Sequence, residues 1–204
     1  MQRFAIKSLV LLTLAVSAAA VSLTIASAAP ERAAEPARPA TVTPVVDATD
    51  IEVLSRRNLL LPVKGVQAKA LLDNFDEGRG KRKHEAIDIL APRGTPVVAV
   101  GDGKVAKLFT SAAGGITAYQ FDPEQRFIYY YAHLERYAEG LKEGLEVKRG
   151  DTIGYVGTSG NAPKNTPHLH FTIFRAGPDK KWWKGTAINP YPLLATPETT
   201  AAAR

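Results

Sequence analysis

Alternation of apolar and polar residues near the end of the chain predicts a β-strand with two distinct faces. The segment His-Leu-His-Phe-Thr-Ile-Phe (168–174) alternates in this way over its whole length. Successive side chains of a strand point to opposite sides, so the apolar residues at odd positions face a core. His168, His170 and Thr172 then share the other face, which brings two imidazoles to one place.

Shorter β-branched and aromatic segments predict a mainly β domain. Strands are predicted at residues 95–100, 104–109, 116–121 and 127–131, near residue 147, and at 153–156. Gly-Asp-Gly (101–103) predicts a hairpin between the first two strands, and Asp122-Pro123 predicts a hairpin between the next two. Close spacing and Gly-rich turns favour antiparallel sheets. One short N-terminal helix is predicted within residues 48–61, with Asp50 as its N-cap.

The first residues have the composition of a targeting segment. A basic start precedes an uncharged run rich in Leu, Val, Ala and Ile, and Ala26-Ser-Ala28 has the small-x-small pattern of a cleavage site. We therefore predict a signal peptide over residues 1–28. The uncharged run within residues 8–29 also approaches the roughly 20 residues that span a bilayer, so an uncleaved membrane anchor is the alternative. Either case implies export to the periplasm or cell envelope.

The rest of the chain divides by composition into three parts. Residues 29–47 are rich in Ala, Pro, Glu, Arg and Thr, and they predict a disordered linker because they cannot bury enough apolar surface to become ordered. Residues 48–195 contain the predicted strands and form one domain of ordinary size. Residues 196–204 are small and mostly uncharged, and they predict a disordered tail.

Composition narrows the chemistry that this domain can perform. The chain has no cysteine and only four histidines, so disulfides, thiolate metal sites and cysteine nucleophiles are excluded. A metal site must then use His, Asp or Glu. The formal net charge of +6 suits an anionic cell-wall or membrane surface. We expect no nucleic-acid partner, because no dense basic run is interleaved with aromatic residues, and we expect a monomer.

His84 and Asp88 form a second pair of candidate ligands. A separation of four residues places both side chains on one face of a strand, and also on one face of a helix. Glu85 would point away from them on a strand. The helical His-Glu-x-x-His zinc motif has a histidine at its fifth position, where this chain has Asp88, so that motif is absent.

These residue types predict a catalytic metal centre. Two histidines and one carboxylate, with a fourth position left open, are typical of a catalytic site that holds one Zn²⁺. Either His168 or His170 completes the set, and the residues alone do not decide between them. The other member of that pair and His133 can then move a proton or stabilise an oxyanion. Taken singly, His133 is more often a structural histidine, and Asp88 a turn cap.

Several motifs in a fixed order make the chain resemble the lysostaphin-type cell-wall metallopeptidases, also known as the LytM domain. The resemblance extends over about residues 61–194, which is nearly all of the predicted domain. The matching segments are HEAIDILAPRGTPVVAVGDGKV (84–105), YAHL (131–134), GDTIGYVGTSGN (150–161), PHLHF (167–171) and INPYPLL (188–194).

The resemblance implies a fold, an activity and a role for each candidate residue. His84, Asp88 and His170 would bind zinc, and His133 and His168 would be the catalytic imidazoles beside it. The implied fold is a pair of antiparallel β-sheets that form a groove (a duplicated hybrid motif), with the metal at its floor. The implied activity is that of a zinc metalloendopeptidase that hydrolyses stem peptides or crosslinks of peptidoglycan.

The chain departs from the family pattern in two places near the first ligand. Ala86 stands where the family commonly has glycine, which is a small change. The family's best-known members have a tyrosine a few residues before the first ligand, and no tyrosine precedes His84 at that distance. Stabilisation of an oxyanion is then left to His133, to His168 or to Arg79.

The sequence leaves two other functions open. A non-catalytic regulator that activates cell-wall amidases would have lost zinc ligands, whereas all five site residues are present here. A glycan-binding module would stack sugars on Tyr129–Tyr131 or on Trp182-Trp183, although such aromatic residues more often belong to a core. In an enzyme of the resembled family, loops such as 110–118 and 161–167 would determine which peptide bond is cut.

Overall fold

The structure is a computed structural model that describes residues 48–195. The predicted signal peptide or anchor (1–28), the linker (29–47) and the tail (196–204) lie outside the described residues. Within residues 48–195, none of the helices combines the length and the apolar character needed to cross a membrane. The elements in chain order are α1 (Ala48–Ser55), η1 (Ala68–Ala70), β1 (Gly78–Arg79), β2 (Arg82–Lys83), β3 (Ile87–Leu90), β4 (Pro96–Val98), β5 (Gly103–Ser111), β6 (Gly115–Phe121), β7 (Phe127–Tyr137), β8 (Glu146–Val147), β9 (Thr152–Val156), β10 (His168–Ala176), β11 (Gly185–Ile188) and α2 (Tyr191–Leu194).

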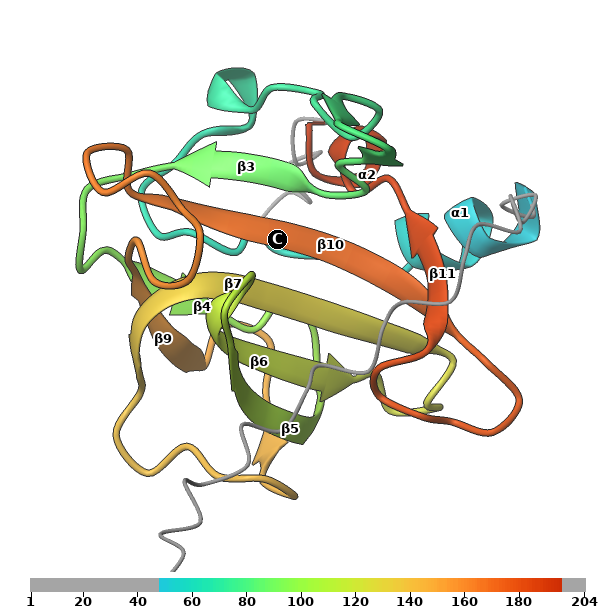
Figure 1. Cartoon of the computed structure of the whole chain (residues 1–204). Helices are drawn as coiled ribbons and strands as arrows, with labels where there is room; N and C mark the ends of the chain where they lie inside the picture. The colour runs from blue at the N-terminus through green and yellow to red at the C-terminus, as the bar shows by residue number, and fades with distance from the viewer. Residues whose placement is uncertain (1–47, 196–204) are drawn as a thin grey trace, which may run out of the picture. The chain divides into compact units, whose positions relative to one another are not determined.

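Antiparallel strands dominate the domain, which confirms the predicted mainly β fold with a short N-terminal helix. Nine strands form one branched sheet whose main path runs β11-β10-β7-β6-β5-β8. β3 pairs with the first half of β10, while β4 pairs with β9, which also pairs with the end of β7. Figure 1 shows β3, β10, β7 and β6 in succession across the molecule. β1 and β2 form a separate two-stranded hairpin.

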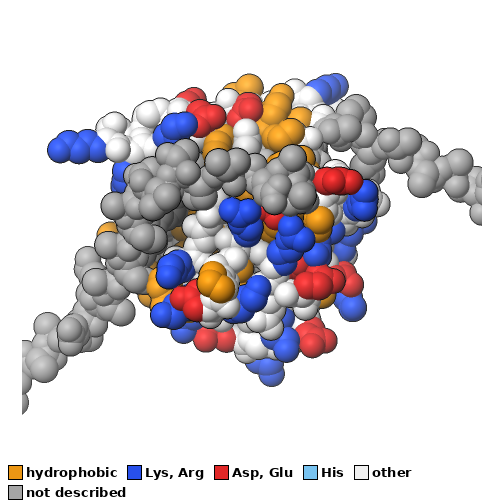
Figure 2. Space-filling view, turned by 90° about the vertical axis from the view of Figure 1, so that its right-hand side faces the viewer, with side chains coloured by type: hydrophobic (Ala, Val, Ile, Leu, Met, Phe, Trp, Pro, Cys, Tyr) orange, Lys and Arg blue, Asp and Glu red, His pale blue; other side chains and the backbone are white. Residues whose placement is uncertain are grey.

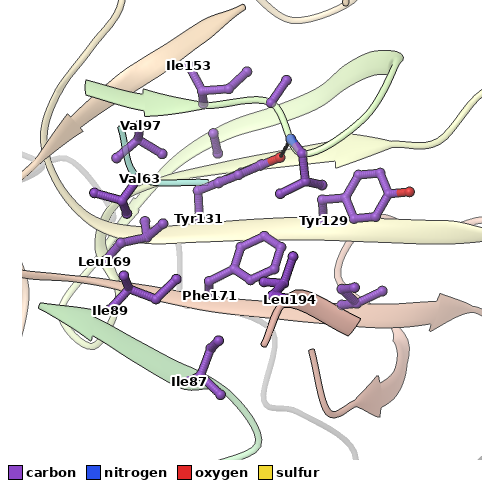
Figure 3. Packing of buried hydrophobic residues seen from close by; sticks show 14 of the residues in the cluster. Val63, Ile87, Ile89, Val97, Tyr129, Tyr131, Ile153, Leu169, Phe171 and Leu194 are labelled. Carbon is purple, nitrogen blue, oxygen red and sulfur yellow. Dashed lines mark hydrogen bonds between the residues drawn. The ribbon is translucent and has the colours of Figure 1, made fainter. Parts of the chain in front are cut away.

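The hydrophobic core lies between the β10–β7 part of the sheet and the β4–β9 pair. The apolar odd-numbered residues of β10 are fully buried, as their alternation predicts. In Figure 3, Leu169 and Phe171 lie on one side of Tyr131, and Val97 and Ile153 lie on its other side. Burying a large apolar side chain contributes roughly 1.5–3 kcal/mol. This burial fixes which face of β10 is turned away from the core.

One of the two predicted hairpins is wrong. β4 and β5 do not pair with each other, because β4 pairs with β9, and β5 pairs with β6 and β8. The segment after β4 is also buried, and Ala99 N donates to Asp151 O at 2.9 Å. A β-branched run predicts a strand but not the strand with which it pairs. Here the run becomes buried by pairing with β9. The second predicted hairpin, β6 with β7, is confirmed.

Two further differences concern the ends of the domain. Near the C-terminal end the structure adds β11, which the sequence does not predict and which pairs with the second half of β10. The short strands β1 and β2 are not predicted either. α1 ends at Ser55, and Asp50 lies in its first turn instead of at its N-cap. The Asp50 carboxylate is fully buried and accepts hydrogen bonds from Arg126 at 2.7 Å and Arg175 at 2.9 Å. A buried carboxylate is costly unless it is paired, so these arginines hold α1 against the sheet.

Candidate metal centre

Strand pairing brings Asp88 and His170 together. Asp88 lies in β3 and His170 lies in β10, and the two residues are directly opposite in the antiparallel register. Residues directly opposite in an antiparallel pair have side chains on the same face and close together. His170 Nδ1 is accordingly 3.1 Å from Asp88 Oδ1. The neighbours Ile87 and Phe171 are fully buried, which keeps the polar pair on the outer face.

His84 reaches the same place by another route. β3 begins at Ile87, so residues 84–88 do not form the continuous strand or helix face that their spacing predicts. Glu85 has a φ of 56°, a left-handed conformation that residues other than glycine seldom adopt. The chain therefore turns sharply just before β3. After this turn, His84 Nε2 lies 3.1 Å from Asp88 Oδ1.

Three candidate ligand atoms form a compact triangle. His84 Nε2, Asp88 Oδ1 and His170 Nδ1 are separated by 3.1 Å in each of the three pairs. Ligands placed tetrahedrally at zinc-binding distance lie about 3.3 Å from one another. The triangle therefore fits three corners of a zinc site and leaves the fourth corner for water or substrate. Within residues 48–195, it is the one such cluster of three potential ligands.

Neighbouring groups orient the members of this triangle. His84 Nδ1 donates to the carbonyl of Asn74 at 3.0 Å, so the lone pair of Nε2 faces the triangle. Asn74 Oδ1 accepts a hydrogen bond from Asp88 N at 3.2 Å. Arg79 Nη2 donates to Asp88 Oδ2 at 3.2 Å, which leaves Oδ1 for the histidines. Contacts of this kind fix the orientation and basicity of metal ligands.

Burial and neighbouring charges shift the pKa values of the proposed ligands in opposite directions. Burial lowers the pKa of His84, but the hydrogen bond and the charge of Asp88 outweigh it, so the pKa is raised overall. Burial alone would raise the pKa of Asp88. Hydrogen bonds from His170 and His84 nevertheless hold that pKa well below its usual range. Asp88 is therefore an anion at neutral pH, as a metal ligand must be.

His133 faces this site because β7 contains a β-bulge. Ile116 of β6 pairs with Leu134 of β7, and Ala118 pairs with Tyr131. Between these two pairs β7 advances by three residues and β6 by two, so β7 has one extra residue. His133 lies within the bulge, and its φ of 58° is again left-handed. Regular alternation would put His133 on the core face together with Tyr131. The bulge instead turns His133 outward, and Leu134 is the next residue that is fully buried in the core.

The loop between β9 and β10 holds the bulge in place. His133 Nδ1 donates to the carbonyl of Ser159 at 2.8 Å, so the lone pair of Nε2 faces the site. Ser159 Oγ donates to the carbonyl of Leu134 at 2.6 Å and accepts from Ile116 N at 2.9 Å. The approach is so close that a Cβ atom at Gly115 would overlap with Ser159. Glycine at that position is what allows the two segments to meet.

His168 completes a group of four imidazoles. Its Nδ1 donates to the carbonyl of Thr166 at 2.8 Å, and its Nε2 lies 3.7 Å from Asp88 Oδ1. The centroid of the His133 ring is 5.0 Å from that of His168 and 5.5 Å from that of His170. Burial, followed by the charge of His170, lowers the pKa of His133 to about 4. The His133 ring is therefore neutral at pH 7 and can accept a proton at Nε2.

The imidazoles line an open cleft of about 600 Å³. Leu72 and Leu90 are exposed large apolar side chains, and both lie at the cleft. Tyr130 also lines the cleft, whereas Tyr129 and Tyr131 belong to the core. Trp182 packs against Tyr119, with ring centroids 4.7 Å apart. The aromatic residues that a glycan-binding module would need are thus largely engaged in packing.

The structure brings all five sequence-predicted residues to one cleft, and it adds orienting groups that the sequence did not identify. These are Asn74, the carbonyl of Thr166, and Ser159. A backbone carbonyl gives no signal in a sequence, because every residue has one. Ser159 does carry a weak signal, since the neighbouring Gly157 and Gly160 indicate a close approach of two backbones.

Comparison with known proteins identifies the domain. The family model "Peptidase family M23" matches residues 82–190. An L-Ala--D-Glu endopeptidase of Bacillus subtilis (strain 168) is 35% identical over 120 residues, which cover 56% of this chain. The peptidoglycan DD-endopeptidase ShyC of Vibrio cholerae is 36% identical over 96 residues, or 47% of this chain. This chain spans only 35% and 21% of the lengths of these two relatives.

Solved structures agree with the assignment. Csd3 of Helicobacter pylori aligns with a TM-score of 0.52 at 30% identity, over 68% of this chain and 33% of that one. Lysostaphin of Staphylococcus simulans aligns with a TM-score of 0.53 over 72% of this chain and 59% of that one, and at 23% identity it supports the fold alone. The predicted resemblance to the lysostaphin-type family is confirmed. Because the family match extends over more than half of its 204 residues, the protein belongs to Peptidase family M23.

Proposed function

We propose that the protein is a zinc-dependent endopeptidase that hydrolyses peptide bonds in the stem peptides or crosslinks of peptidoglycan. The observation that carries this proposal is the convergence of three potential ligands with two further imidazoles. His84, Asp88 and His170 would hold one zinc ion per chain. His133 and His168 present Nε2 to the same cleft, because a backbone carbonyl engages Nδ1 of each ring.

The donor set supports zinc as the ion. Two imidazole nitrogens and one carboxylate oxygen are typical ligands of catalytic zinc, and the 3.1 Å separations suit tetrahedral geometry. The absence of thiolates and the single carboxylate argue against copper(I) and against calcium. When bound, zinc supplies a Lewis acid that polarises the scissile carbonyl and activates water.

The protein's own residues would supply the proton transfers and the orientation. His133 is neutral at pH 7 and would take a proton from the attacking water at Nε2. His133 would then pass this proton on to the leaving amine, and His168, whose Nε2 faces the same cleft, would in its imidazolium form stabilise the developing oxyanion by a hydrogen bond. Arg79 holds Asp88 through Oδ2 and would add positive charge to the cleft in which the oxyanion develops.

The named relatives support the choice of substrate. The family relatives include an L-Ala--D-Glu endopeptidase and a peptidoglycan DD-endopeptidase, and both names describe hydrolysis of peptide bonds. A peptidoglycan substrate also fits the predicted export of this chain, with residues 1–28 as a signal peptide or residues 8–29 as an anchor. We include in the proposal that the domain of residues 48–195 acts as a monomer in the cell envelope.

Hydrolysis of purified peptidoglycan tests the proposed activity. The purified protein should release new amino groups from peptidoglycan, a chelator should abolish the release, and added Zn²⁺ should restore it. Elemental analysis should find about one zinc per chain. Release that continues after complete removal of the metal would contradict the zinc assignment.

A single substitution separates the enzyme from the non-catalytic regulator. His168→Ala leaves all three proposed ligands in place and removes one imidazole from the cleft. An enzyme should lose about 10²–10⁴-fold in rate, whereas a regulator that activates amidases should keep its effect on those amidases. Lys142→Gln, an exposed cation outside the cleft, is the matched control and should behave like the wild type.

A further inference from the structure

We propose that the β1–β2 hairpin is a carboxylate-binding wall of the cleft, with Arg82 as its principal contact. The protein would accordingly prefer an anionic peptide, with a free carboxylate near the scissile bond, to a neutral peptide such as polyglycine. This inference rests on the proposed endopeptidase function, and it adds a substrate class and a residue that selects it.

The hairpin places several cations directly beside the ligand residues. β1 and β2 are joined by Gly80 and Lys81, and the segment 78–83 reads Gly-Arg-Gly-Lys-Arg-Lys. Arg79, Arg82 and Lys83 line the cleft together with the histidines. His84 follows this segment immediately, so the hairpin and the candidate metal centre are linked by the shortest possible stretch of chain.

The two arginines lie on one face of the hairpin. Arg79 and Arg82 are direct cross-strand partners in the hairpin, so their side chains share one face. Like charges directly opposite in an antiparallel pair are destabilising. A carboxylate bound between the two guanidinium groups would remove this repulsion. The arrangement therefore favours the binding of an anion over a purely structural role.

Ion pairs engage Arg79 and Lys83 but not Arg82. Arg79 contacts Asp88 at 3.2 Å and Glu77 at 3.4 Å, and Lys83 contacts Asp76 at 2.7 Å. Among the described residues, Arg82 has neither a hydrogen-bond partner nor an ion-pair partner for its side chain, which is exposed. Its planar guanidinium can therefore bind both oxygens of an incoming carboxylate.

The charge of the cleft differs from that of the face seen in Figure 2. The cleft is lined by three cations, and its one acidic residue is Asp88, which is a proposed metal ligand. Figure 2, by contrast, shows a face on which Lys and Arg side chains are mixed with Asp and Glu. An anionic substrate would consequently be attracted to the cleft and oriented within it.

A pair of matched peptides tests the inference. Two stem-type peptides are compared that differ only in a free carboxylate or a carboxamide next to the scissile bond. The full-length, zinc-loaded wild type should cleave the carboxylate peptide with a kcat/KM about 10-fold or more above that for the carboxamide peptide, as a charge-assisted bidentate contact allows. Salt should reduce the preference through screening.

Variants test whether the preference for the carboxylate peptide depends on Arg82. Arg82→Gln should reduce the ratio of the two kcat/KM values to about 1, Arg82→Lys should retain part of it, and Lys142→Gln should retain all of it. Melting temperature and zinc content establish that each variant is folded and loaded. An unchanged ratio in folded Arg82→Gln, or equal cleavage of both peptides by the wild type, would overturn the inference while leaving the proposed function intact. Failure to cleave either peptide would overturn both.

Discussion

The two halves of the candidate site are built differently. On one side, regular pairing of β3 with β10 places Asp88 opposite His170, and simple alternation keeps both side chains outside the core. On the other side, His133 depends on a bulge in β7 and on a backbone conformation with a φ of 58°. Regular pairing fixes two of the three proposed ligands, whereas an irregularity stabilised by a distant loop fixes a proposed catalytic imidazole.

The two halves of the site are held in place by different kinds of contact. The ligand half is held by buried side chains on the reverse face, such as Ile87 and Phe171. The bulge half is held by the Ser159 hydroxyl, which donates to the carbonyl of Leu134 and accepts from Ile116 N, and by the close contact at Gly115. We therefore expect substitutions in the first half to affect metal binding, and substitutions in the second half to affect catalysis or stability without loss of metal.

The largest effect is expected from His170→Ala in the ligand half. Loss of one of three ligands should reduce the zinc content to near zero and lower peptidoglycan hydrolysis to background, because both the Lewis acid and the activated water are lost. Elemental analysis and an amine-release assay measure the two effects. Full zinc occupancy in this variant would show that the triangle is not the metal site.

A smaller effect on rate is expected from His133→Ala in the bulge half. The variant should keep about one zinc per chain and lose about 10²–10⁴-fold in kcat, because one imidazole that moves a proton is removed. The same two assays apply. Zinc loss comparable to that of His170→Ala would contradict the expectation that the ligand half binds the metal and the bulge half contributes only to catalysis and stability.

Ser159→Ala tests the support of the bulge itself. The substitution removes the hydroxyl that bonds the carbonyl of Leu134 and the backbone N–H of Ile116. We expect about 1–3 kcal/mol of lost stability in urea unfolding and a loss of rate smaller than that of His133→Ala. Ser55→Ala is the control, because its hydroxyl bonds an exposed helix carbonyl and its loss should cost much less.

An effect of similar size is the pH dependence of the stability of the metal-free protein. Burial lowers the pKa of His133 to about 4, whereas an unfolded histidine titrates near 6.5. The unfolded chain therefore binds more protons between these values, and this contribution to stability is present above about pH 6.5 and is lost as the pH falls toward 4. Between pH 7 and pH 5 the loss should be about 2 kcal/mol.

His133→Asn provides the comparison for this pH effect. The variant cannot titrate at this position, so its free energy of unfolding should fall less between pH 7 and pH 5 than that of the wild type. Urea unfolding of both chelator-treated proteins at the two pH values measures the difference. Equal pH dependence in the two proteins would mean that His133 is not held in its neutral form by burial.

Sequence patterns were reliable where one rule of local geometry decides the outcome. Strict alternation in residues 168–174 predicted that Leu169, Phe171 and Ile173 are buried in the core and that His168 and His170 share the other face. The spacing of His84 and Asp88 predicted their proximity, although a turn at Glu85 produces it instead of a strand or helix face. The same kind of pattern failed for β4 and β5, because β-propensity does not specify a partner strand.

The sequence by itself determined the mainly β fold, the two histidines on one face of β10, and the family whose motifs follow in this order. Only the tertiary structure decided that His133 faces the cleft, since alternation along β7 would turn it toward the core. It also decided which atoms meet: the carbonyl of Ser159 that orients His133, the carbonyl of Asn74 that orients His84, and the ion pair of Arg79 with Asp88 join segments that no local pattern relates. The physical reason is that alternation is a property of neighbouring residues, whereas a bulge or a loop contact depends on burial and hydrogen bonds contributed by distant ones.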